Sequence, residues 1–265
     1  MDAMRRTIPT LCILALLAGA RAQATEFGPG AEEVQRCAEK NMPERTTRQR
    51  VALERRDRAG NVRRMEATVL WKRDAEKVSR MLARVEAPPD ERGTAFLMIE
   101  SEDGSEMWSY LPELGRVRRV TSRSAGSVLG TDLSYEDLEE LQLVAPRARV
   151  ERLPDATLDG RAVYVLAGFP APDSGSAYAR ILSQIDRESC VALRTALEAP
   201  GERVVKEIRI DFVDLERRGE RWLPRKARLR NLDNASETLL SIEKQEIDLE
   251  LPDRLFTQGE LSKGH

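Results

Sequence analysis

The stretch that decides the fold is residues 93–143, GTAFLMIESEDGSEMWSYLPELGRVRRVTSRSAGSVLGTDLSYEDLEELQL. It opens with an almost wholly apolar run at 95–100, which predicts a strand buried on both faces. Glu-Asp-Gly-Ser then has turn chemistry, because glycine tolerates a positive φ. Residues 107–111 form the return strand, which ends at Pro112 because proline cannot donate to a strand ladder.

The second half of the stretch predicts a lid over this hairpin. A short strand at 117–120 leads into a loop rich in serine and glycine, with Val128 and Leu129 as an exposed apolar pair. A short amphipathic helix follows, since Ser134 is a good N-cap and Asp137 a capping-box partner three residues later. We expect the loop at 121–131 to open and close.

Outward from this stretch, apolar and polar residues alternate with a period of two, as in half-buried antiparallel strands. Interruptions of the alternation near Lys206 and between 242 and 247 predict bulges. We expect about ten or eleven strands, and helices at 32–41 and after Ser134. The flanking segments with strand patterns are 49–56, 62–73, 77–87, 148–153, 161–169, 177–186, 191–198, 203–215, 222–232 and 236–250.

Residues 1–24 have the pattern of a secretory signal. Arginines precede a short apolar core, and small residues allow cleavage near Ala22 or Ala24. The core is shorter than the roughly 20 apolar residues of a spanning helix. We therefore expect one domain at 25–265, periplasmic and without a transmembrane segment.

The net charge and the cysteines further limit the classes of function and the possible covalent links. The chain has a formal charge of −2; removing 1–24 takes away three arginines and one aspartate and leaves −4. Such a balanced chain gives no sign of nucleic-acid binding. Cys37 and Cys190 remain after cleavage. A disulfide, worth about 2–4 kcal/mol, and two inert thiols are both open, and geometry decides.

Three motifs resemble one known family: LPELGRVRRV at 111–120, GSVLGTDLSYEDL at 126–138 and LPDRLFT at 251–257. They look like the outer-membrane lipoprotein-sorting family, the LolA/LolB-like proteins, and within it the uncharacterised LolA-like branch. The resemblance implies a mainly β (α+β) fold, a single open, curved antiparallel half-barrel with two or three helices across its mouth. It also implies a short helical tail at 253–258. It also implies acyl chains in the cavity, but it identifies no cargo.

Enzymatic chemistry has little support. The single histidine is His265, so neither a histidine-based catalytic triad nor a histidine metal site can form inside the fold. No glycine-rich phosphate-binding motif occurs. The carboxylates at 136, 137, 139 and 140 are explained by the solvated face of an amphipathic helix. We expect no catalytic residue, no metal and no cofactor.

The positive case rests on inward-facing apolar residues, since methionine and aromatic side chains adapt to irregular apolar ligands. Plain core packing is the alternative. The predicted cavity residues are Met65, Val69, Trp71, Met81, Val85, Leu97, Ile99, Trp108, Tyr110, Leu129, Leu133 and Leu138.

A basic cluster beside the lid predicts a surface for anionic head groups or a partner. It consists of Arg116, Arg118, Arg119 and Arg123. Arginine binds phosphate through a bidentate fork. The alternative is outward charge on an edge strand, which discourages edge pairing.

Two functions fit these expectations. The first is a monomeric periplasmic carrier for a lipid or lipoprotein, shielding acyl chains and passing them between envelope membranes or to a membrane transporter. The second is a non-catalytic module of the same fold that senses lipid or envelope stress and docks on a membrane protein. The fold alone does not identify the cargo.

Overall fold

The structure is a computed structural model that describes residues 28–75, 78–101, 104–124, 126–141, 149–172 and 174–263. The predicted signal at 1–24 and His265 lie outside the described residues. Within them, no helix has the length and apolar character needed to cross a membrane.

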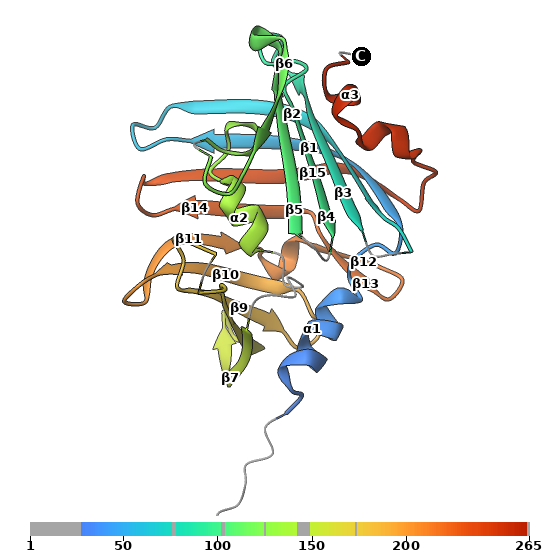
Figure 1. Ribbon diagram of the computed structural model, residues 1–265. Helices are drawn as coiled ribbons and strands as arrows, with labels where there is room; N and C mark the ends of the chain where they lie inside the picture. Colours follow the sequence, from blue (N-terminus) through green and yellow to red (C-terminus); the bar gives the residue numbers. More distant parts are fainter. Residues whose placement is uncertain are drawn as a thin grey trace, which may run out of the picture.

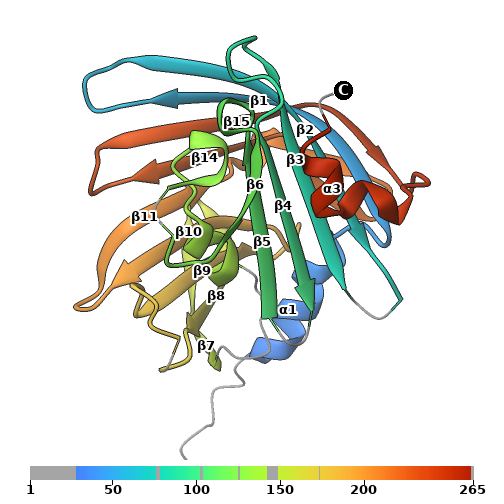
Figure 2. The same cartoon turned by 45° about the horizontal axis from the view of Figure 1, so that its top comes forward.

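One large antiparallel sheet dominates the described chain, with its strands in the order β6-β5-β4-β3-β2-β1-β15-β14-β11-β10-β9-β8-β7. Figures 1 and 2 show that it curves strongly and stays open, with β6 and β7 as its two edges. The strands of this sheet are β1 (Thr46–Arg56), β2 (Val62–Arg73), β3 (Ser79–Ala87), β4 (Ala95–Ser101), β5 (Gly104–Leu111), β6 (Arg116–Val120), β7 (Arg149–Leu158), β8 (Arg161–Phe169), β9 (Arg180–Asp186), β10 (Ala192–Ala199), β11 (Arg203–Arg209), β14 (Lys226–Asn231) and β15 (Ser236–Ile247). The predicted open antiparallel half-barrel is confirmed.

The described chain has fifteen strands, more than the ten or eleven expected. Thirteen segments have a strand pattern, and two of them are each divided into two strands. The pattern at 203–215 covers β11, the 3₁₀ turn η3 (Phe212–Asp214) and the start of β12 (Leu215–Arg218). The pattern at 222–232 covers the end of β13 (Arg221–Pro224) and all of β14. β12 and β13 pair only with each other, as a small separate hairpin. The alternation of apolar and polar residues continues through the residues that connect these strands. It therefore does not show where the chain leaves the main sheet.

The predicted bulges are present. Leu197 pairs with Lys206 and Glu198 with Val204, which leaves Val205 as the extra residue of β11. In β15 the partners of Arg50 and Val51 are Lys244 and Ile242, so Glu243 is extra. Bulges increase local twist, which helps a wide sheet to curve.

Register separates the two faces of the sheet. On one face Val51 lies opposite both Ala67 and Ile242. These residues belong to a cluster with Val128 and Leu129 of the lid segment, so this is the concave face. On the other face Leu97 lies opposite both Leu82 and Trp108. Those three belong to a different cluster.

The helices divide between these faces. α1 (Ala31–Glu39) packs through Val34 against Leu166 and Ile185 on the concave side, and α2 (Tyr135–Glu140) also covers that side (Figure 1). The predicted C-terminal helical segment exists as η4 (Asp253–Phe256) followed by α3 (Gln258–Leu261). It covers the convex face, because Phe256 and Leu261 pack with Leu97. The expectation that every helix lies across the mouth is therefore wrong for this segment.

A disulfide joins α1 to the turn between β9 and β10. Cys37 is bonded to Cys190, and their Cα atoms are 5.5 Å apart across a sequence separation of 153 residues. The structure thus contains the bridge that the sequence left open.

Candidate functional site

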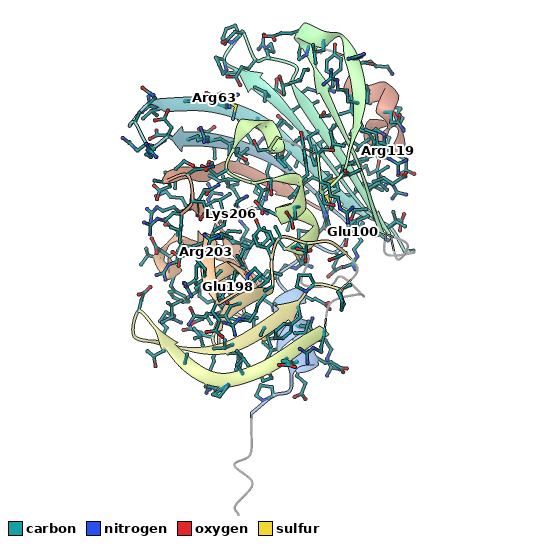
Figure 3. The ribbon with its side chains drawn as sticks, turned by 60° about the vertical axis from the view of Figure 1, so that its left-hand side comes forward. Arg63, Glu100, Arg119, Glu198, Arg203 and Lys206 are labelled. Carbon is teal, nitrogen blue, oxygen red and sulfur yellow. A yellow bond between two sulfur atoms is a disulfide. The ribbon has the colours of Figure 1, made fainter. Side chains whose placement is uncertain are left out.

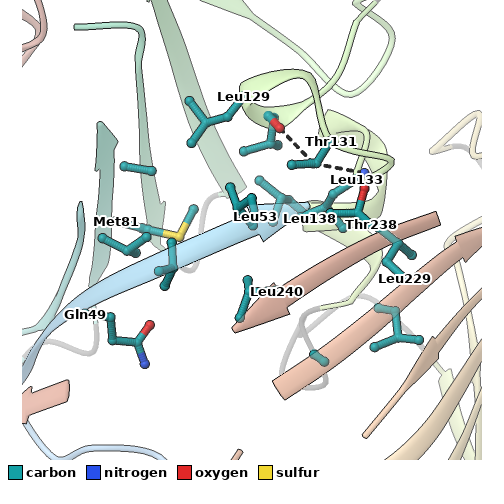
Figure 4. Close-up of a pocket in the computed structure, with 16 residues that line it drawn as sticks. Gln49, Leu53, Met81, Leu129, Thr131, Leu133, Leu138, Leu229, Thr238 and Leu240 are labelled. Carbon is teal, nitrogen blue, oxygen red and sulfur yellow. Dashed lines mark hydrogen bonds between the residues drawn. The ribbon is translucent and has the colours of Figure 1, made fainter. Parts of the chain in front are cut away.

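The concave face encloses an apolar cavity of about 310 Å³ beneath the lid segment (Figure 4). This volume lies at the lower end of the range of about 300–1,000 Å³ typical of small-molecule sites. Thirteen of the sixteen lining residues are apolar, the others being Gln49, Thr131 and Thr238. None of the sixteen lining side chains carries an ionisable group. The cavity therefore suits a hydrocarbon chain and offers no side chain for acid–base catalysis. The apolar lining residues are Val51, Leu53, Val69, Met81, Ala83, Val128, Leu129, Leu133, Leu138, Ile208, Ala227, Leu229 and Leu240.

The lid is the described part of residues 121–141, with the 3₁₀ turn η2 (Val128–Gly130) at its tip and α2 behind it. Ser127 and Ser134 form an isolated antiparallel bridge, and the amide of Val128 donates to the carbonyl of Leu133 at 2.8 Å. The predicted capping box begins α2 in full: Ser134 and Asp137 each accept the other's backbone N–H.

The lid is closed. Val128 and Leu129 at its tip are only 7% and 8% exposed, and Tyr135 stacks on Phe96 of β4 with ring centroids 5.6 Å apart. Leu129 adopts φ 50°, an unfavourable region for a residue with a bulky side chain. The surrounding contacts therefore hold a backbone conformation that the free loop would rarely adopt.

Asp132 anchors the tip of the lid to the sheet. Its carboxylate accepts hydrogen bonds from Ser236 at 2.5 Å, Thr238 at 2.7 Å and Arg55 at 3.2 Å. Its backbone amide donates to the Thr238 hydroxyl. The side chain is almost completely buried, so these donors replace the lost water.

Asp137 anchors α2 and is fully buried. Its carboxylate accepts from Tyr178 at 2.5 Å and from the Lys206 ammonium of β11 at 2.6 Å. Burial, and then the negative charge of Asp137, raise the pKa of Tyr178, so this phenol remains a donor. Figure 3 shows Lys206 pointing toward α2. The solvated-face interpretation is therefore wrong for Asp137.

Further polar contacts hold the lid at its tip and at α2. Arg63 of β2 donates to the carbonyl of Gly130 at 3.2 Å. Gly130 has φ +68°, a backbone conformation that residues with a side chain rarely adopt, so this position favours glycine. On α2, Glu136 accepts from the Ser176 hydroxyl and the Ala177 amide.

The structure brings five of the predicted cavity residues together at the cavity wall: Val69, Met81, Leu129, Leu133 and Leu138. Met65 and Val85 belong to the same concave cluster without lining the cavity. Trp71 lies opposite Met81, which places it on the concave face beyond the cavity wall.

Four predicted cavity residues lie on the wrong face. Leu97, Ile99, Trp108 and Tyr110 belong to the convex cluster, which Leu251, Phe256 and Leu261 of the C-terminal segment cover. The run at 95–100 is apolar on both sides, as predicted, so its alternation cannot identify the cavity side. Phe96 and Met98 are the residues of β4 that face the lid.

Sequence reasoning missed the wall supplied by the C-terminal half, which includes Ile208, Leu229 and Leu240. A signal existed in the alternation of 236–247. It could have been used only with knowledge that β15 pairs with β1, because that pairing carries the concave face into the second half of the chain.

The predicted basic cluster does not form one surface. All three arginines of the edge strand β6 are exposed. Arg118 lies opposite Ser109 and so points to the same side of the sheet as Ser109. Arg119 lies opposite Trp108 and so points to the other, convex side. Arg119 pairs with Glu106 at 2.8 Å. Arg123 belongs to the lid and donates to the carbonyl of Ser174. Arg116 and Arg118 alone share a side.

Among the residues that the structure describes, no group of three or more histidine, cysteine, aspartate or glutamate side chains could hold a metal ion.

The family model that matches the chain, over residues 77–263, describes an uncharacterised protein family. None of the curated proteins matches the sequence.

Solved structures resemble the fold closely. A domain from Vibrio parahaemolyticus named for outer membrane lipoprotein sorting is 21% identical, with a TM-score of 0.79, over 88% of this chain and 98% of that one. A DUF1329 family protein from Desulfovibrio piger is 22% identical, with a TM-score of 0.78, over 87% and 97%. A LolA superfamily protein from Nitrosomonas europaea is 18% identical, with a TM-score of 0.67, over 86% and 98%. At these identities the similarity establishes the fold and leaves the cargo open.

Proposed function

The chain belongs to the uncharacterised LolA-like branch of the outer-membrane lipoprotein-sorting family, and from this premise we propose that it is a periplasmic lipid carrier. It binds the acyl chains of a lipid or lipoprotein in the concave cavity and passes them between envelope membranes or to a membrane transporter.

The observation that carries the proposal is the lidded cavity with its apolar, uncharged wall. Moving one methylene from water into such a site contributes about 0.8 kcal/mol. A chain of several methylenes therefore binds without any charged contact, and the selectivity for hydrocarbon comes from the wall.

The lid has the properties that loading and unloading require. Its tip inserts apolar side chains over the cavity, while its anchors are polar side chains, above all Asp132 and Asp137. When the lid opens, water can replace the hydrogen bonds of these carboxylates, so opening does not leave them unsatisfied. We assign the gating step to this segment.

We further propose that Arg116 and Arg118 contact anionic groups of the donor or acceptor membrane. They are exposed on the edge strand that leads directly into the lid. Guanidinium groups pair well with phosphate, so they would hold the cavity mouth beside lipid head groups.

Native mass spectrometry of the mature protein isolated from periplasm, followed by organic extraction, tests the carrier function. We expect phospholipid or another acyl species bound at near-unit occupancy, and the extract identifies its class. A ligand-free mass together with no uptake of added lipid would overturn the carrier proposal and favour a sensing module that docks on a membrane protein.

A further inference from the structure

The turn between β5 and β6 exposes two leucines at one end of the sheet. It is the 3₁₀ turn η1 (Pro112–Leu114), the green turn at the upper end of Figure 1. Leu111, just before it, and Leu114, at its end, are 42% and 45% exposed. The other large apolar side chains that are exposed in the described residues lie on three other segments, at Met42, Val213 and Leu232. This turn therefore concentrates exposed apolar surface, which is typical of an interaction site.

Local backbone chemistry fixes the turn. Pro112 begins it, and Gly115 ends it with φ +59°, where the Gly115 amide donates to the carbonyls of Leu111 and Pro112. The Pro112 ring also lies beside the loop between β3 and β4, since a Cβ on Gly93 of that loop would be 3.4 Å from it. The leucines are thus presented in a fixed conformation, so binding through them costs little additional ordering.

Arginines surround the two leucines. Arg116 and Arg118 follow the turn on β6, and Arg92 lies on the adjoining loop; all three are exposed, and none forms an ion pair within the described residues. The exposed acids of the same two turns are Asp90 and Glu113. Apolar side chains flanked by arginines match a bilayer that contains anionic lipid, because hydrocarbon receives the leucines and phosphate receives the guanidinium groups.

The size of the turn favours a bilayer over a protein as the partner. A stable protein–protein interface buries about 800 Å² on each partner and needs complementary shape. A bilayer needs no fitted surface, so a small projecting turn is sufficient.

One arginine connects this region to the tip of the lid. The Arg63 guanidinium donates to the carboxylate of Glu91, in the loop beside Pro112, and to the carbonyl of Gly130 at 3.2 Å. A membrane that receives the leucines therefore lies near the lid tip.

We propose that the turn carrying Leu111 and Leu114 inserts into a bilayer containing anionic lipid, while Arg92, Arg116 and Arg118 bind the lipid phosphates. This extends the membrane contact of the proposed function and rests on it. It names the residues that enter the hydrocarbon and turns the lid tip toward the membrane. Because two leucines bury little apolar area, docking is weak and reversible, as a carrier that leaves the membrane requires.

Co-sedimentation of the mature protein with vesicles tests the docking. Vesicles of three parts phosphatidylethanolamine to one part phosphatidylglycerol should bind it about tenfold more tightly than vesicles of phosphatidylcholine at low ionic strength. The double change Leu111→Ser and Leu114→Ser should weaken binding to the anionic vesicles about tenfold, because it removes the apolar surface that enters the bilayer. Leu232→Ser is the matched control: Leu232 is 43% exposed in the turn between β14 and β15, and this variant should bind like the wild type.

A fluorophore separates insertion from attraction to the membrane surface. Bimane attached to Leu114→Cys should emit at shorter wavelength, and be quenched by spin-labelled acyl chains, when the anionic vesicles bind. The same label on Leu232→Cys should show neither change. Cys37 and Cys190 are bonded to each other, so the label reaches the introduced thiol.

The outcomes separate this inference from the carrier function. The docking is overturned if the wild type does not bind the anionic vesicles, if the double variant binds them equally well, or if the label at position 114 does not respond. Lipid found by native mass spectrometry would still support the carrier in each of these cases. A protein that docks as expected but neither contains nor takes up lipid overturns the carrier function alone.

Discussion

Among individual residues, Asp137 is a buried carboxylate that depends on several hydrogen-bond and charge partners. It is fully buried, begins α2 as a capping-box partner and receives the Lys206 ammonium and the Tyr178 hydroxyl. A buried ion pair adds little compared with apolar packing, but removing one partner leaves a buried charge uncompensated. Asp137 is therefore most informative when its charge alone is removed.

Asp137→Asn should lower the free energy of unfolding by about 3 kcal/mol, because Lys206 loses its counter-charge while the shape of the side chain is kept. Urea unfolding measures the change. Asp253→Asn is the matched control, since Asp253 pairs with Lys72 but its side chain is 76% exposed, and the effect of its loss on stability should be much smaller. Equal effects of the two variants would contradict the buried anchor.

We expect the stability of the fold to depend on pH through Glu100 of β4 (Figure 3). Burial raises the pKa of its carboxyl, and the nearby Arg73 only partly opposes the shift. Because the folded pKa exceeds the unfolded one, the protonated group favours the folded state at low pH. That contribution is lost as pH rises through the folded pKa.

Glu100→Gln should therefore raise the melting temperature more at pH 7 than at pH 4, where the wild-type carboxyl is largely protonated in both states. Thermal unfolding of both proteins at the two pH values measures the difference. An equal change at both pH values would show that ionisation of Glu100 does not affect stability.

At the scale of elements, the disulfide secures α1 to the far end of the concave face. Its sequence separation of 153 residues is long, so closing this loop restricts the unfolded chain strongly. α1 is short, and among its residues Val34 is the buried one. The covalent bond therefore provides much of what keeps this helix in place.

Replacing both Cys37 and Cys190 by serine should lower the free energy of unfolding by about 2–4 kcal/mol. Urea unfolding of the oxidised wild type, the reduced wild type and the double variant measures this, and the last two should agree. Alkylation of the exported protein in denaturant without reductant should modify neither cysteine. Two reactive thiols would rule out the bridge.

Short-range patterns predicted most elements, because turn chemistry, capping and period-two alternation are local properties. The capping box at Ser134 and the bulge beside Lys206 are examples. The faces of β4 and β5 were not predictable in this way. The C-terminal segment covers Leu97 from more than 150 residues away, so both sides of that hairpin are apolar for different reasons. Likewise, the buried state of Asp137 depends on Lys206 and Tyr178, which are distant in sequence.

For the whole molecule, the sheet has two apolar faces with different tasks. The convex cluster around Leu97 is closed by the C-terminal segment, where buried Arg84 donates to the carbonyls of Glu260 and Leu261. The concave cluster is closed by the lid, over a cavity. The convex face is thus filled, and the concave face leaves room for a ligand. On this strongly curved side α1, α2 and the lid together still leave a cavity of about 310 Å³.

A pair of charge insertions tests which face carries the cargo. Met81→Glu places a carboxylate at the wall of the cavity, where a partly exposed side chain tolerates it. We expect it to remove most co-purifying lipid and to lower the free energy of unfolding less than a charge at a fully buried position does, because Met81 is only partly buried.

Leu97→Glu is the matched variant on the other face. Leu97 is fully buried beneath the C-terminal segment, so a charge there should cost at least about 3 kcal/mol. Any folded fraction should still bind lipid at the wild-type stoichiometry, because the cavity is intact. Lipid extracted per mole of folded protein and urea unfolding measure the two effects. If Leu97→Glu abolished lipid binding and Met81→Glu did not, the cargo would lie on the convex face, and the lid could not be its gate.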